Sequence, residues 1–101
     1  MKAISSSLQA ASAVIFAGSC WYLGGTLVTD PTNGGTAKDV IMTIWDSPTS
    51  TTTDDVEIDY FQGSDEVLNE CHILEEPVWC SKGIYAKLDA AEGDYIVWYA
   101  L

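Results

Sequence analysis

Residues 40–62, VIMTIWDSPTSTTTDDVEIDYFQ, contain two short apolar runs on either side of a segment rich in Ser, Thr, Pro and Asp. Apolar residues recur at every second position in both runs, as Val40, Met42 and Ile44 and then as Val56, Ile58 and Tyr60. Residues two apart share one face of a strand, whereas a helix needs spacings of three and four. Pro and Asp in the intervening segment favour a turn. The stretch therefore predicts two antiparallel strands, with Glu57 and Asp59 on a solvent-facing side.

The rest of the chain has the same organisation. Clusters of Gly, Pro, Asn and Asp, including EEP at 75–77, separate short runs rich in β-branched and aromatic residues, a pattern typical of all-β domains. We expect a single domain over residues 1–101, an antiparallel β-sandwich or jelly-roll-like barrel of about seven or eight short strands, with residues 1–11 as an N-terminal arm. Only residues 65–74 are compatible with a helical turn. The last run, 95–101, is apolar on both faces, which predicts a strand central in the sandwich or covered by another subunit.

The charge balance restricts the partners. The chain has 15 Asp and Glu against 4 Lys and Arg, a formal net charge of -11, while 48% of its residues are hydrophobic. Affinity for nucleic acid comes largely from Lys and Arg that displace counterions, so this surface predicts no nucleic-acid partner. Anionic membranes are disfavoured for the same reason. We expect a partner with a neutral, apolar or basic surface.

Residues 13–23, AVIFAGSCWYL, raise the question of an export signal with a lipidated cysteine. The preceding region has one positive charge, Lys2, and the apolar run is diluted by Ser and Gln. Position 17 is Ala, where a lipoprotein signal favours a branched apolar residue. No run approaches the roughly 18 apolar residues of a membrane span. The stretch instead predicts two strands, 12–17 and 20–29, joined by Gly18-Ser19, and an exported lipoprotein is the least favoured reading.

Three cysteines, Cys20, Cys71 and Cys80, are too few for a disulfide scaffold, and we expect small buried residues. Cys71 and Cys80 could pair if adjacent strands bring them together. A Cys₃His zinc site with His72 is disfavoured, because Cys71 and His72 are neighbours whose side chains point to opposite faces of a strand. The same geometry argues against a Cys–His nucleophile. We expect a buried Cys71 beside a surface His72.

The densest acidic stretch comprises Asp54, Asp55, Glu57 and Asp59, with Asp46 nearby. The glycine-containing order of a calcium-binding loop is missing, so these residues predict a solvated loop and strand face. A carboxylate pair for glycoside hydrolysis is compatible with them, although a chain of 101 residues offers little wall for a substrate cleft. We predict no catalytic residue, no cofactor and no metal ligand.

Four tryptophans are many for a chain of this length. Because a buried indole needs a partner for its N–H, Trp is common at interfaces. We expect some of the four to fill the core and at least one to lie in a subunit contact. The residues assigned to a subunit or partner interface are Trp21, Trp79, Tyr95, Val97, Trp98, Tyr99 and Leu101.

The order of motifs resembles small structural proteins encoded by tailed bacteriophages. The resemblance lies in GGTLV, then VIMTIWDS followed by a Ser/Thr-rich loop, then EEPVWCSKGIYAKLD and the terminal DYIVWYAL, and it spans roughly residues 13–101. Such proteins include trimeric capsid decoration (cement) proteins and fibre or tail accessories. The resemblance implies a β-sandwich without enzymatic activity.

The expected function is therefore that of a non-enzymatic virion protein assembled in the bacterial cytoplasm. The expected partners are two further copies of the chain and the lattice of the major capsid protein, which bound decoration protein would stabilise. The alternative is a receptor- or glycan-binding module of a fibre or adhesin. In that case exposed Trp and Tyr would stack on sugars, and Asp residues of the SPTSTTTDD loop, 47–55, would bind hydroxyls.

Overall fold

The structure is a computed structural model that describes residues 2–29, 39–64, 69–89 and 93–101. The described residues form strands and no helix. The strands are β1 (Ile4–Ser5), β2 (Ala13–Ala17), β3 (Cys20–Thr29), β4 (Val40–Asp46), β5 (Val56–Gly63), β6 (Asn69–Cys80), β7 (Gly83–Leu88) and β8 (Gly93–Ala100).

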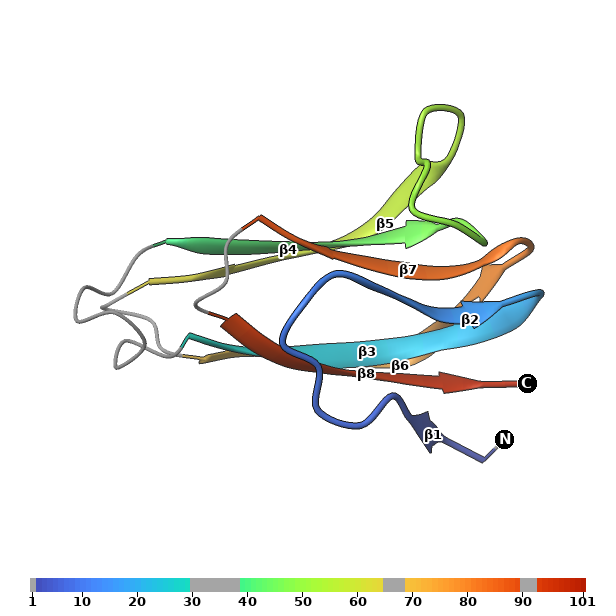
Figure 1. Cartoon of the computed structure of the whole chain (residues 1–101). Helices are drawn as coiled ribbons and strands as arrows, with labels where there is room; N and C mark the ends of the chain where they lie inside the picture. Colours follow the sequence, from blue (N-terminus) through green and yellow to red (C-terminus); the bar gives the residue numbers. More distant parts are fainter. Residues whose placement is uncertain (1, 30–38, 65–68, 90–92) are drawn as a thin grey trace.

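The strands form two antiparallel four-stranded sheets. The first sheet has the order β1-β8-β3-β6 and the second the order β2-β7-β4-β5. Pairing is nested, because β4 pairs with β5, β3 with β6, β2 with β7 and β1 with β8. This is the strand order of a jelly roll. Figure 1 shows the sheets as two layers rather than a closed barrel, so the fold is the predicted β-sandwich.

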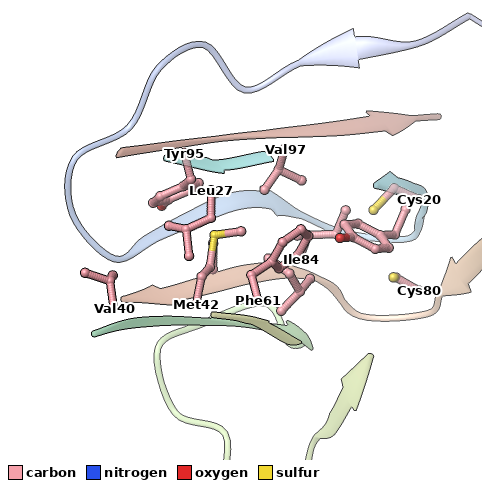
Figure 2. Packing of buried hydrophobic residues seen from close by; sticks show 12 residues of the cluster. Cys20, Leu27, Val40, Met42, Phe61, Cys80, Ile84, Tyr95 and Val97 are labelled. Carbon is pink, nitrogen blue, oxygen red and sulfur yellow. The ribbon is translucent and has the colours of Figure 1, made fainter. Parts of the chain in front are cut away.

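The core lies between the two layers. The first sheet contributes Cys20, Tyr22, Leu27, Cys80, Tyr95 and Val97, and the second contributes Val40, Met42, Ile44, Phe61, Ile84 and Ala86 (Figure 2). Each of these side chains is at most 1% exposed. Burial of this apolar surface is the main stabilising term of the fold, at roughly 25 cal/mol per Å².

Several predicted strands are confirmed. Val40, Met42 and Ile44 all face the core from β4. The two strands predicted at 12–17 and 20–29 are present as β2 and β3, and the turn between them is Gly18-Ser19. The doubly apolar last strand, β8, lies between β1 and β3, so it is central in its sheet; that another subunit covers its outer face stays a prediction. Part of the 1–11 segment lies along β8, where Ser6 N–H donates to the Val97 carbonyl at 2.8 Å.

The helical turn predicted for residues 65–74 is wrong for residues 69–74, which belong to β6; residues 65–68 lie outside the described part. The turn expected at EEP, 75–77, is also absent, because β6 continues through it. Pro77 is tolerated there because β6 is an edge strand, and its pairing with β3 is irregular between Ile73 and Val78.

The alternation predicted for β5 is confirmed at Glu57 and Ile58 but is wrong at Val56, Asp59 and Tyr60. Ile44 pairs with Asp59 whereas Trp45 pairs with Glu57, so Ile58 is the extra residue of a bulge. A bulge moves all following side chains to the other face. Phe61 is therefore buried and Asp59 points inward, while Tyr60 is 47% exposed. Val56, which precedes the bulge, is 65% exposed as well.

Candidate functional site

The outer face of the first sheet is apolar. Because Cys20 and Tyr22 point into the core, Trp21 and Leu23 point outward from β3. The same alternation turns Trp98 of β8 outward beside the buried Val97. Trp79 and Ile73 complete the set from β6, where they are 50% and 78% exposed. We call these five residues the aromatic face.

The aromatic face has defined geometry. Trp21 and Trp79 are cross-strand partners whose ring centroids lie 4.9 Å apart, edge to face. Beside them, Leu23, Ile73, Leu74, Trp98 and Ala3 line an apolar hollow of about 260 Å³. A ring pair next to an apolar hollow offers a rigid contact surface, since indole rings lose little conformational entropy on binding.

Acidic side chains predominate in the strands that carry the aromatic face. Apart from His72, every ionisable acid or base in the four strands of the first sheet is acidic: Glu70, Glu75, Glu76 and Asp94. Glu75 and Glu76 are exposed on the edge strand β6. The described strands of this sheet hold no Lys or Arg, so the face suits a partner with apolar groups at its centre and neutral or basic groups around them.

The seven residues that the sequence analysis assigned to an interface lie in different parts of the structure. Trp21, Trp79 and Trp98 come together on the aromatic face. Tyr95 and Val97 lie in the core, and Tyr99 packs against the core with its ring 5.5 Å from Phe16. Leu101 follows β8 and is exposed.

The expectation that some tryptophans fill the core is wrong. None of the four is among the buried residues. Trp45 lies on the second sheet, where its indole N–H donates to the Thr43 hydroxyl at 3.0 Å. The core is instead filled by Tyr22, Phe61, Tyr95 and smaller side chains, so indole rings remain available at the surface.

The cysteines behave differently from one another. Cys20 and Cys80 are buried, as predicted, but Cys71 is exposed. Cys71 and Cys80 lie on the same strand, β6, nine positions apart. At about 3.3 Å per residue they are far too distant to bond to each other.

The assignment of His72 to the surface and Cys71 to the core is reversed. His72 points inward and stacks on Phe61, with ring centroids 4.1 Å apart. Its Nδ1 lies 2.9 Å from Asp59 Oδ1 and its Nε2 2.9 Å from Glu70 Oε1. The phase shift in β5 brings Asp59 inward, where it also accepts a 2.6 Å hydrogen bond from the Tyr22 hydroxyl. The sequence analysis missed this cluster because no residue of β5 indicates the bulge, which is evident only from the pairing of β5 with β4.

Desolvation alone lowers the pKa of His72, but its hydrogen bonds to Glu70 and Asp59 outweigh that effect and raise the pKa above its ordinary value. A neutral imidazole has one N–H, so two carboxylate contacts require the protonated ring. Burial, together with the contact to Asp59, raises the pKa of the Tyr22 hydroxyl. The cluster therefore links β3, β5 and β6 as an imidazolium held by two carboxylates.

The acidic loop contributes structural contacts. Asp46 accepts hydrogen bonds from the backbone N–H groups of Ser81, Lys82 and Gly83, at 3.2, 2.9 and 3.2 Å. Asp55 pairs with Lys82 Nζ at 2.6 Å. These contacts hold the β4–β5 loop against the β6–β7 turn.

A hollow of about 400 Å³ beside this loop is lined by Pro48, Thr49, Thr51, Thr53, Asp54, Asp55 and Lys82. The described residues that line it include no aromatic ring. The combination of stacking rings and loop carboxylates expected for glycan binding is therefore not assembled in this hollow.

No set of three or more His, Cys, Asp and Glu side chains is placed to hold a metal ion within the described ranges. The same residues contain no helix with the length and apolarity needed to cross a membrane. Comparisons with protein families, with curated proteins and with solved structures find no significant match to the chain. The fold and the aromatic face thus define an all-β module with a candidate protein-contact surface.

Proposed function

We propose that the protein is a non-enzymatic virion structural protein of a tailed phage, a homotrimeric capsid decoration protein that stabilises the capsid shell. The observation that carries the proposal is the aromatic face, an exposed apolar surface on a small acidic jelly roll. Large exposed apolar patches on a soluble domain mark sites of association.

Two further considerations support this proposal. The order of motifs along residues 13–101 is interpreted as similar to that of small phage structural proteins, and jelly rolls are frequent among viral capsid domains. Fold alone does not determine function, so the argument rests on the face. Trp and Tyr anchors of this kind dominate the binding energy of protein interfaces.

The aromatic face is proposed to dock on the capsid lattice rather than on the same face of another copy. Two copies placed face to face would bring together two sheets whose charged strand residues are mainly acidic, in a molecule with a formal net charge of -11. Like charges at an interface are costly. A shell surface with neutral or basic groups around an apolar centre avoids this repulsion.

The test uses two matched substitutions, Ile73→Asp on the aromatic face and Val56→Asp on β5. Both residues are exposed apolar side chains, at 78% and 65%, so neither change disturbs the core. The wild-type protein and V56D should sediment as trimers, bind capsids that lack the protein and raise their melting temperature. I73D should lose at least tenfold in capsid affinity, because a buried unpaired charge costs more than about 1.4 kcal/mol. A monomer that ignores capsids, or equal binding by both variants, contradicts the proposal.

Glycan binding is the second candidate, favoured by the exposure of Trp79 beside Trp21. Flat aromatic surfaces also suit sugar rings. A glycan array that gives saturable binding, lost in Trp79→Ala and retained in Val56→Asp, would favour this candidate over a capsid contact.

A further inference from the structure

Two cysteines face each other across the first sheet. Cys20 is the first residue of β3 and Cys80 the last of β6, and the two are direct Cα partners in the antiparallel register. The next pairs along the strands, Trp21–Trp79 and Tyr22–Val78, continue the same register without a bulge. The edge-to-face contact of the two indoles fixes this register from the outer side.

The thiol groups of the pair are in contact. Both side chains are 0% exposed and lie at the same end of the core (Figure 2). The two thiols are close enough to share a hydrogen bond. Directly opposed residues of antiparallel strands have Cα atoms about 4.5–5.5 Å apart, which is within the range that disulfides span. Both cysteines are in the thiol form in the structure.

We propose that Cys20 and Cys80 are a site of disulfide formation, at which a cross-strand bond closes β3 onto β6 when the chain meets a small-molecule disulfide. The thiolate of one cysteine attacks a sulfur of the oxidant, forms a mixed disulfide and releases one thiol. The second cysteine then attacks its partner's sulfur and releases the other thiol. The protein loses two protons and two electrons, and the oxidant gains them as it becomes two thiols. The proposal is independent of what the aromatic face binds.

The surroundings of the pair control when it reacts. Burial raises the pKa of both thiols, that of Cys80 to about 12, so the reactive thiolate is scarce in the closed fold. Each cysteine adjoins a turn, Gly18-Ser19 before Cys20 and Ser81-Lys82 after Cys80. The thiols are exposed to the oxidant when these strand ends open locally, or earlier, before the chain has finished folding. Once formed, the bond is protected from reductants by the same burial.

The bond would act on the whole fold. It closes a loop from residue 20 to residue 80, and in the chain-entropy account long loops restrict the unfolded chain most. The oxidised protein should melt on the order of 10 °C higher than the dithiol form.

The experiment uses the Cys71→Ala protein, because the exposed Cys71 thiol would react first with the oxidant. The protein is incubated with oxidised glutathione in urea below the unfolding transition, and the urea is then removed. Its mass should fall by two hydrogens. The lysines at 2, 38, 82 and 87 place Cys20 in the tryptic fragment 3–38 and Cys80 in the fragment 39–82. Mass spectrometry should find these two fragments joined, and a reductant applied in denaturant should separate them.

The matched control is the double variant Cys71→Ala, Cys80→Ala, which should gain glutathione at Cys20 and form no joined fragment. Glutathione adducts without a joined fragment in the Cys71→Ala protein would overturn the proposal. A joined form that melts at or below the temperature of the dithiol form would overturn it as well.

Discussion

Gly24 is the residue on which the geometry of the first sheet depends most. The registers of β3 with both β6 and β8 shift between Tyr22 and Gly24. Gly24 has φ of 131°, a conformation that side chains with Cβ rarely adopt. A Cβ at this position would lie 2.0 Å from the His72 carbonyl oxygen. The shift keeps Tyr22 and Leu27 on the core side and Trp21 and Leu23 on the outer side, so this glycine supports both the core and the aromatic face.

Gly24→Ala should therefore be strongly destabilising, by on the order of 3 kcal/mol in urea unfolding. Gly18→Ala is the matched control. Gly18 also has a positive φ, 134°, but its Cβ would meet only the Phe16 ring, at 3.3 Å. Both variants carry the backbone cost of roughly 1–3 kcal/mol, and Gly24→Ala adds a backbone clash. Equal losses of stability in the two variants would contradict this account of the bulge.

At the scale of the strands, the His72 cluster joins the edge strands of the two sheets. β5 is an edge of the second sheet and β6 an edge of the first. Asp59 and Glu70 hold the imidazole from these two strands, and Tyr22 orients Asp59 from β3. Edge strands lack a hydrogen-bonded neighbour on one side, so side-chain contacts between them contribute to closing the sandwich.

The stability of the fold should depend on pH through His72. Its folded-state pKa is raised above the unfolded value, so its contribution is fully present below the unfolded pKa, about 6.5, and is lost as pH rises through the folded pKa. The difference in unfolding free energy between the wild type and His72→Gln should be largest near pH 6 and fall toward about pH 9. Urea unfolding across this range measures it. A difference that is constant with pH, or that grows toward alkaline pH, would show that the ring is not held as an imidazolium.

The periodicity of apolar residues predicted where the strands lie better than it predicted which of their side chains face the core. The alternation of Val40, Met42 and Ile44 fixed the inward face of β4, because no bulge interrupts these residues. The same rule failed in β5, where Ile58 is an extra residue whose effect only the pairing with β4 reveals. The assignment of His72 and Cys71 to the wrong faces has a similar cause. Which face of β6 is inward depends on its irregular pairing with β3, which sequence spacing does not encode.

The whole molecule combines an apolar face with an acidic surface. Trp21, Trp79 and Trp98 were predicted as interface residues from their chemistry and do share the aromatic face, whereas Tyr95 and Val97 are used in the core. Composition can indicate that indoles suit a contact, but the nested strand order decides which side of β8 is the inner one. The strand order therefore determines which aromatic residues share the aromatic face. The proposed partner of this face is a shell surface with apolar and basic groups.

Electron cryo-microscopy of the phage particle in which the protein is proposed to assemble tests the capsid-docking claim most directly. The account predicts sandwich-shaped density on the outside of the shell, in groups of three. The sheet that carries Trp21, Ile73 and Trp79 should lie against the capsid protein. A particle that contains the protein with this sheet turned to solvent, or that lacks the protein altogether, would contradict the claim.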